Sequence, residues 1–258
     1  MSNESTFEAR AIREAEVYDN EGTSRKTYNS ILSHCEAIWM PKVIERFRKE
    51  LIRDDVNDVL ELGSQCWSWV FKAADEMPEN LAGINISKGE IERGAELGRE
   101  LGFVPNFHLM NAHKMSFADE SFDAVFGFGI LHHLDYETSL DEVYRVLRPG
   151  GVMIFNEPLG MNPVGRLVRY LTPKARTVDE QPLLSQHLRM FGERFDIEFI
   201  PHQFLSVPAG VISRFTFSSG DNLLMRMAFQ ADRLLLKIPG LGFWFRTLAI
   251  VGRKRVAD

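Results

Sequence analysis

An apolar run that ends in an acid, a glycine and a small polar residue constrains the fold of this 258-residue chain more than any other stretch. The run is Val59-Leu60-Glu61-Leu62-Gly63-Ser64, and helix-forming sequence follows at 65–74. This order predicts a buried strand, a sharp turn and a helix. Such a turn presents backbone N–H groups and a helix N-terminus at the carboxyl end of a parallel sheet, where open α/β folds bind ligands.

Further apolar runs of strand length follow, mostly alternating with helical sequence. The predicted strands after the first are 81–86, 107–110, 122–126, 152–155, 195–200 and 247–251. The predicted helices are 87–101, opened by the capping box Ser87-x-x-Glu90, then 139–147, which closes at 149–151, then 164–171 and an amphipathic helix near 222–237. This alternation predicts a parallel sheet covered on both faces, and the last two strands, with an insertion between them, fit an antiparallel end.

Helical patterns at about 7–18, 25–39 and 43–51 precede the first strand. The hydrophobic share of 45% is ample for a full core. Net charge is −6 with acids and bases interspersed, which argues against a nucleic-acid partner. Two cysteines, Cys35 and Cys66, without a CxxC motif fit a reducing cytoplasm. No apolar run reaches the ~18 residues of a membrane span, and the polar start does not resemble a signal peptide.

Six short motifs, in this order, resemble those of the class I S-adenosylmethionine-dependent methyltransferases. They are Val59–Ser64, 83–87, Asn111-Ala112, 117–123, 129–134 and 145–151, so the resemblance covers roughly residues 55–155. It implies an α/β, Rossmann-like, seven-stranded and mostly parallel sheet with helices on both faces, extra N-terminal helices and an inserted helical cap. It also implies that S-adenosylmethionine is the cofactor.

The resemblance assigns roles at the strand ends. Glu61 would orient the loop around the cofactor, and Gly63 and Ser64 would begin the turn near the methionine tail. Asn85 would grip the ribose hydroxyls. The full set of cofactor-binding candidates is Arg25, Glu61, Gly63, Ser64, Gln65, Trp67, Asn85, Ile86, Asn111, Ala112 and Gly127, with the Asn111-Ala112 pair beside the adenine and Gly127 beneath the methionine part.

Two departures from the family pattern stand out. The turn continues as Gln65-Cys66-Trp67-Ser68-Trp69, where relatives carry further glycines that permit close backbone approach. Trp67 is therefore either a core aromatic or a ring placed near the sulfonium. Asn85 and Asn111 replace acids, and an amide bonds a hydroxyl without charge assistance.

The catalytic candidates are His132, His133, Tyr18 and Tyr28. The histidines follow the fourth predicted strand, where a base could take a proton from an acceptor, and the alternative is a packing or capping role. Tyr18, Arg25 and Tyr28 lie on the N-terminal helices, which lid the cofactor in relatives. We expect no metal site, because the histidines lack accompanying carboxylates at ligand spacing.

We expect residues 1–54 to form a helical lid, and residues 55–258 to form the cofactor-binding domain with substrate-enclosing insertions at about 157–193 and 205–242. The leading functional hypothesis is methyl transfer to a small-molecule acceptor. One alternative is a cyclase, in which the cofactor's own amine expels methylthioadenosine and an azetidine-2-carboxylate-type ring forms. The other is a non-catalytic binding protein. The apolar stretch 234–245 is expected to cover the core or a homodimer contact, with a membrane-surface role as the alternative.

Overall fold

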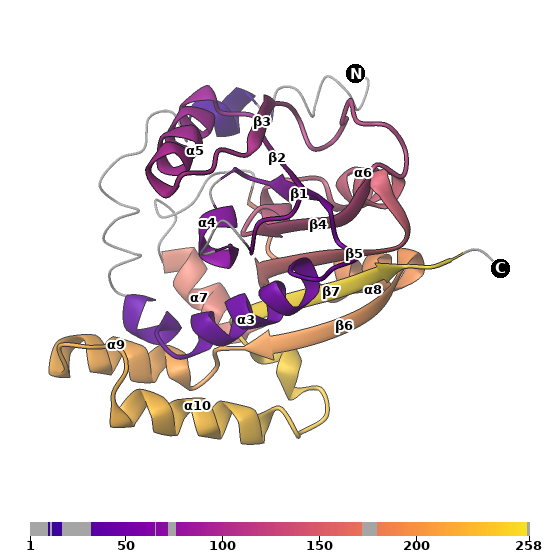
Figure 1. Ribbon diagram of the computed structural model, residues 1–258. Coiled ribbons are helices and arrows are strands. Elements are labelled where there is room, and N and C mark those ends of the chain that lie inside the picture. The colour runs from indigo at the N-terminus through magenta and orange to yellow at the C-terminus, as the bar shows by residue number, and fades with distance from the viewer. Residues whose placement is uncertain are drawn as a thin grey trace.

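The computed structural model describes residues 10, 12–16, 32–64, 66–71, 76–171 and 180–256. Its strands are β1 (Asp58–Leu62), β2 (Asn80–Asn85), β3 (Asn106–Leu109), β4 (Phe122–Phe128), β5 (Leu147–Pro158), β6 (Phe195–His202) and β7 (Thr247–Lys254). They form a seven-stranded sheet in the order β3-β2-β1-β4-β5-β7-β6 (Figure 1). β7 is antiparallel to β5 and β6, and the other pairs are parallel. The predicted fold class is confirmed.

Helices cover both faces of the sheet. They are α3 (Trp39–Leu51), α4 (Trp67–Val70), α5 (Lys88–Leu101), α6 (Tyr136–Val146), α7 (Pro163–Leu171), α8 (Ser185–Arg194), α9 (Ser206–Thr216) and α10 (Leu223–Leu235), with 3-10 turns η2 (Leu131–His133) and η4 (Leu241–Trp244). Alternate strand residues point to opposite faces, so the sheet carries two cores. Apolar residues of α6 and α8 fill one of them, and those of α3 and α4 fill the other.

Local capping sets the helix bounds. Ser87 Oγ accepts from the Glu90 backbone N–H at 3.1 Å, so the predicted start of α5 is correct. α6 begins at Tyr136, ahead of the predicted 139, because Asp135 Oδ1 accepts from the Thr138 N–H at 2.9 Å.

Three further predicted boundaries are wrong. Residues 149–151 do not close a helix but lie within β5, where the pairing with β4 shifts register between Phe122 and Ala124. The predicted helix 65–74 is represented by Trp67–Val70 alone among the described residues, because the backbone is already extended at Phe71. Trp39 opens α3 rather than ending the helix before it.

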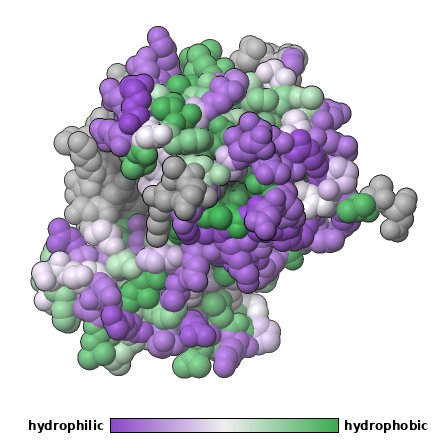
Figure 2. Space-filling model, viewed as in Figure 1, coloured by the Kyte–Doolittle hydropathy of each residue, from purple (hydrophilic) through white to green (hydrophobic). Residues whose placement is uncertain are grey.

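The α9–α10 pair forms an excursion between β6 and β7. Because β7 runs antiparallel to β6, the excursion begins and ends at the same end of the sheet. This is the end at which the parallel strands have their carboxyl termini. The two helices lie together at the bottom of Figure 1. In the space-filling view, apolar side chains show among polar ones over this pair (Figure 2).

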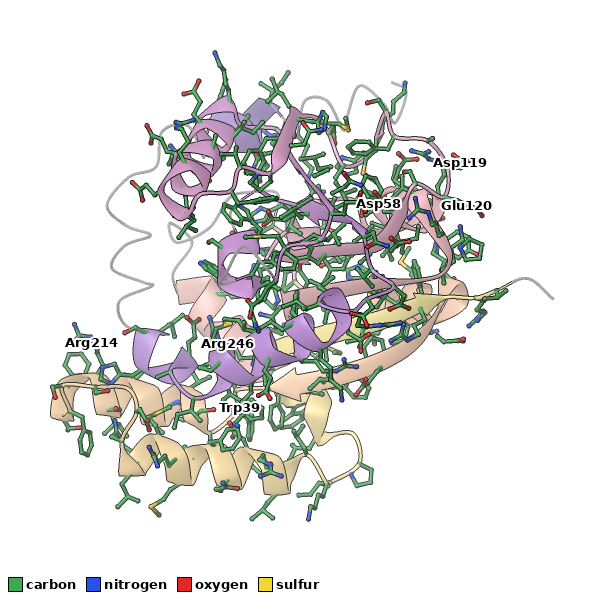
Figure 3. All side chains as sticks on the ribbon, viewed as in Figure 1. Trp39, Asp58, Asp119, Glu120, Arg214 and Arg246 are labelled. Atoms are coloured by element: carbon green, nitrogen blue, oxygen red, sulfur yellow. The ribbon has the colours of Figure 1, made fainter. Side chains whose placement is uncertain are left out.

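Trp39 anchors this excursion to the body of the protein, pointing from α3 toward α10 (Figure 3). Its Nε1 donates to Ser206 Oγ at 3.1 Å and to Asp232 Oδ2 at 3.2 Å, and its ring lies 4.6 Å from that of Phe229. The buried Asp232 carboxylate also accepts from the backbone N–H groups of Phe204, Leu205 and Ser206 at the start of α9. One side chain of α10 therefore caps α9 and holds α3.

Candidate functional site

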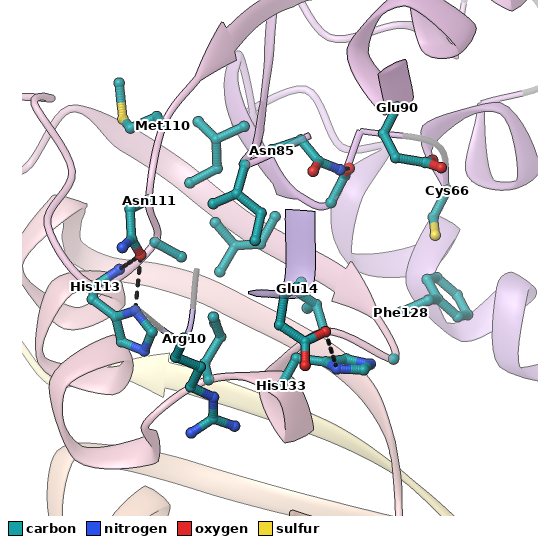
Figure 4. Close-up of a pocket in the computed structure, with 18 residues that line it drawn as sticks. Arg10, Glu14, Cys66, Asn85, Glu90, Met110, Asn111, His113, Phe128 and His133 are labelled. Atoms are coloured by element: carbon teal, nitrogen blue, oxygen red, sulfur yellow. Dashed lines mark hydrogen bonds and ion pairs between the residues drawn. The ribbon is translucent and has the colours of Figure 1, made fainter. Parts of the chain in front are cut away.

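A pocket opens at the carboxyl ends of β1, β2 and β4 (Figure 4). Five predicted cofactor residues line it: Gly63, Asn85, Ile86, Asn111 and Ala112. The lining also includes Arg10 and Glu14 from the N-terminal segment, which no local sequence signal had indicated. Cys66, Glu90 and Phe128 complete the side of the pocket that faces α4 and α5.

The turn after β1 takes an unusual backbone path. Gly63 has φ +127° and Ser64 has φ +89°, so two successive residues lie at positive φ. No atom of the described residues lies within 4 Å of the position a Cβ would take at Gly63, so the glycine is required for its conformation rather than for space. A serine at positive φ is strained and persists only where its surroundings hold it.

Glu61 holds the far side of this turn. Its side chain is fully buried, and Oε1 accepts from the backbone N–H groups of Cys66 at 2.5 Å and Trp67 at 3.3 Å. A carboxylate is well suited to these N–H groups because α4 begins here. Glu61 thus fixes the backbone of the turn, and its role around a cofactor stays a prediction.

Asn85 holds the near side. Its amide nitrogen donates to the Gly63 carbonyl and, at 3.1 Å, to Ser64 Oγ. Its Oδ1 accepts from the Ser87 N–H at 2.9 Å. A carboxylate in place of this amide could not donate to the Gly63 carbonyl, which is the physical reason for an asparagine here. The sequence had suggested a ribose contact for Asn85, and the structure shows the same side chain bracing the turn.

Asn111 and His113 form a second polar unit on the opposite wall. Asn111 Oδ1 accepts from the His113 backbone N–H at 3.0 Å and from His113 Nδ1 at 2.8 Å, so Nδ1 carries the proton. His113 Nε2 then accepts from the Asp135 N–H at 2.8 Å. Burial, with nearby Arg10 adding to it, lowers the pKa of His113 to about 4. The imidazole is therefore a neutral brace between the ends of β3 and η2.

Trp67 does not reach the pocket. It is fully buried in the core on the α3–α4 side, 6.4 Å from the Phe103 ring, so the interpretation of Trp67 as a core aromatic is the one the structure supports. Cys66 lines the pocket instead, and burial raises the pKa of its thiol well above the ordinary value. The bulky turn leaves the pocket open because its tryptophan packs inward.

Gly127 also lies beneath the pocket rather than in its wall. A Cβ there would meet the Leu62 carbonyl oxygen at 2.9 Å and an Ile130 methyl at 2.7 Å, so this glycine is required by packing. The neighbouring Gly129, at φ +61°, is the glycine of this strand end that lines the pocket.

Two histidine–carboxylate pairs lie at the pocket, one in its lining and one behind it. His132 Nδ1 bonds to Glu157 Oε2 at 2.7 Å, and Glu157 Oε1 accepts from the Ile130 and Leu131 N–H groups at 2.9 Å each. His133 Nδ1 bonds to Glu14 Oε2 at 3.0 Å, and both of these side chains are buried. Of the two histidines, His133 lines the pocket. Burial lowers the pKa of His133, although Glu14 acts in the opposite direction.

The expectation that these histidines lack acidic neighbours was wrong. Glu14, Glu157 and Glu180 converge on them from distant parts of the chain, and ligand-type atoms of His132, His133 and Glu180 lie within 4.8 Å of one another. The remaining candidates Tyr18, Arg25, Tyr28 and Gln65 lie outside the described residues.

Comparison with known proteins agrees with this geometry. Residues 60–155 match the family model of a methyltransferase domain. The chain is 30% identical over 149 residues to a demethylmenaquinone methyltransferase of Bacteroides fragilis, and the match spans 55% of this chain and 58% of that relative.

Solved structures share the fold. The YcgJ protein of Bacillus subtilis superposes with a TM-score of 0.58 at 18% identity, over 84% of this chain and 100% of that one. A geranyl diphosphate C-methyltransferase of Streptomyces coelicolor A3(2), solved with Mg²⁺, geranyl diphosphate and S-adenosyl-L-homocysteine, superposes with a TM-score of 0.56 at 15% identity, over 84% and 77%. In its matched domain, its strand order and its pocket at the strand ends, the chain is similar to the class I S-adenosylmethionine-dependent methyltransferases, and its match spans a little over half the length of its curated relatives.

Proposed function

We propose that the protein transfers a methyl group from S-adenosylmethionine to a small-molecule acceptor. The observation that carries the proposal is the pocket at the carboxyl ends of β1, β2 and β4, lined by the residues to which the family motifs assign the cofactor. The relative from Bacteroides fragilis bears the name of a demethylmenaquinone methyltransferase, so a quinol of that type is the first acceptor to test.

The lining fits a nucleoside with an amino-acid tail. Open space lies beside Gly63, where a tail could approach the backbone, and Leu62, Ile84 and Ala112 offer apolar contacts to a flat ring. Among the described residues, none accepts a hydrogen bond from the Asn111 amide nitrogen, so this donor is available to a ring nitrogen. Glu90 and Asn85 supply the polar groups of the wall that faces α5.

The bound cofactor supplies a methyl group already activated on a sulfonium. The chain's own contribution is to fix the acceptor in line, to exclude water and, where the acceptor must lose a proton, to take it. We assign that last role to His133. Its Nδ1 lies 3.0 Å from Glu14 Oε2, and burial lowers its pKa, which favours the neutral ring that a base requires near pH 7.

The cyclase alternative loses its motivation. It rested on a turn rebuilt by Trp67 and Trp69 so as to fold the methionine tail. Trp67 instead packs in the core, and Trp69 is half exposed with its edge toward Phe128 at 5.7 Å. Neither tryptophan lines the pocket.

Mass spectrometry of the reaction products tests the proposal. The protein is incubated with S-adenosylmethionine alone and with a reduced demethylated quinol of short side chain. We expect S-adenosylhomocysteine and a product heavier by one methylene only when the acceptor is present. Methylthioadenosine formed without an acceptor would contradict methyl transfer and support cyclisation.

A further inference from the structure

α10 carries an apolar stripe that its packing does not need. Its inward face, made by Met225, Ala228, Phe229 and Asp232, is buried against α9 and Trp39. The outward residues Leu223, Met227 and Leu234 are nevertheless 71%, 63% and 63% exposed. Their spacing of four and seven places them on one side of the helix. Folding of the helix therefore does not account for this second stripe.

Exposed apolar side chains are concentrated in this part of the molecule. Of the eighteen large apolar residues that the structure shows as exposed, ten lie between residues 205 and 246, a stretch of about a sixth of the chain. On α9, Phe215 is 81% exposed. Beyond α10, Ile238 and the η4 residues Phe243 and Trp244 are about half exposed. Within the stretch 234–245, Phe245 lies in the core with Leu235, Leu236 and Leu241 packed against it, so the expectation that the stretch covers the core is confirmed for these residues and not for the exposed ones. Apolar groups gathered in this way mark a surface that meets a partner.

The charge of the same stretch is opposite to that of the whole chain. Residues 205–246 carry five basic residues and two acids, whereas the chain as a whole has a net charge of −6. Of the two acids, Asp232 is fully buried and Asp221 pairs with Arg226 at 2.7 Å. Arg233 on α10 and Lys237, two residues beyond its end, are exposed beside Leu234. An exposed apolar stripe flanked by basic residues is the pattern of helices that lie in the interface of anionic membranes.

We propose that α10, with Ile238 and η4, docks this protein on an anionic lipid surface. A second copy of the chain fits the same face less well, because the contact would bury Lys237, and lysine is depleted at protein interfaces. None of the helices that the structure describes combines the length and hydrophobicity needed to cross a bilayer, so the attachment is to the membrane surface.

The position of α10 gives the docking a consequence. The α9–α10 excursion leaves the sheet from the edge at which the pocket opens. Docking through α10 therefore places the carboxyl ends of the parallel strands beside the lipid. This inference concerns the surface alone and holds whether or not the pocket transfers a methyl group.

Sedimentation with vesicles tests the proposal. The full chain is mixed with vesicles of phosphatidylcholine containing phosphatidylglycerol, and with vesicles of phosphatidylcholine alone. We expect binding to the anionic vesicles that weakens as salt rises. The double variant Met227→Glu/Leu234→Glu should bind at least tenfold more weakly. Arg233→Gln/Lys237→Gln should lose about fivefold per charge and lose the preference for phosphatidylglycerol.

Matched controls separate this surface from general stickiness. Leu101→Glu and Arg99→Gln alter comparably exposed positions on α5 and should bind as the wild type does. Circular dichroism shows whether each variant is folded. Equal binding by Met227→Glu/Leu234→Glu and the wild type would overturn the proposal. So would a wild-type dimer that this variant converts to a monomer, in the absence of vesicle binding.

Discussion

Asn85 shows how a single side chain compensates for an altered turn. Its amide donates to the Gly63 carbonyl and to Ser64 Oγ, and it accepts from the Ser87 N–H, so it fixes two residues at positive φ against the end of β2. Glu61 fixes the other side through Cys66 and Trp67. Two braces thus replace the conformational freedom that additional glycines would give.

Asn85→Asp should therefore lower the free energy of unfolding, even though it restores the acid that relatives carry. The carboxylate cannot donate to the Gly63 carbonyl and would repel it. We expect a loss of about 1–3 kcal/mol in the free energy of unfolding, measured by urea denaturation. Asn106→Asp, at an exposed position that begins β3, is the control and should cost less than ~0.5 kcal/mol. Equal stability of the two variants would show that the brace is unimportant.

His133 provides a prediction for the pH dependence of the rate. A base acts in its neutral form, and burial lowers the pKa of His133 below its usual 6.5. The rate should therefore stay high as the pH falls to 6.5 and decline only at lower pH. His133→Gln should lower kcat by about 10²-fold or more and abolish that acid limb. A variant that retained both the rate and the limb would exclude His133 as the base.

At the scale of elements, Asp232 binds three segments together. It caps the first turn of α9 and accepts from Trp39 of α3. Asp232→Ala would leave these buried donors unpaired, so we expect a loss of about 3 kcal/mol or more in the free energy of unfolding. Asp221→Ala, which removes only an exposed ion pair with Arg226, should leave the free energy of unfolding nearly unchanged. Similar losses in both variants would contradict this account of the excursion.

The buried end of β6 should make stability depend on pH. His202 Nε2 bonds to Asn156 Oδ1 at 2.8 Å, and burial, with Arg246 adding to it, lowers the pKa of His202 to about 3. The unfolded chain takes up a proton near pH 6.5 and the folded protein does not, so stability is lost as the pH falls from 6.5 toward 3. His202→Gln keeps a donor for Asn156 and should flatten the slope of unfolding free energy between pH 6.5 and 4. An unchanged slope would show that other groups cause it.

The sequence predicted the elements better than their ends. Each strand was recognisable as an apolar run, and Ser87 marked the start of α5 through a local cap. The start of α6 was missed because Asp135, which caps through the same kind of bond, is followed at the third position by Thr138 and so does not complete the Ser-x-x-Glu pattern that marked α5. Residues 149–151 resembled a helix stop, yet they lie within β5 between Leu147 and Val152, whose pairing with β4 no local pattern encodes.

The same distinction applies to the pocket. Gly63, Asn85 and Asn111 lie at strand ends, so the motif order was enough to bring them together. Glu14 and Glu180 reach the histidine pair from segments far away in the chain, and only the tertiary fold shows it. The direction in which Trp67 points depends on its packing against Phe103, which sequence spacing does not determine.

At the scale of the whole molecule, one edge of the sheet collects the functional features. The strand ends supply the pocket, the N-terminal segment adds Arg10 and Glu14, and the α9–α10 excursion leaves from the same edge. The topology places the α9–α10 excursion and the pocket at the same strand ends, where open α/β sheets bind their ligands. The methyl-transfer proposal depends on what binds in the pocket, and the cofactor is the first ligand to establish.

Titration calorimetry with S-adenosylhomocysteine tests that point most directly, on the wild type and on two glycine variants. A Cβ meets no atom at either Gly63 or Gly192, but Gly63 alone of the two is at positive φ and lines the pocket. We predict one-to-one binding by the wild type and by Gly192→Ala, and at least tenfold weaker binding by Gly63→Ala. No heat with the folded wild type, or equal affinity in all three proteins, would contradict a cofactor site beside Gly63.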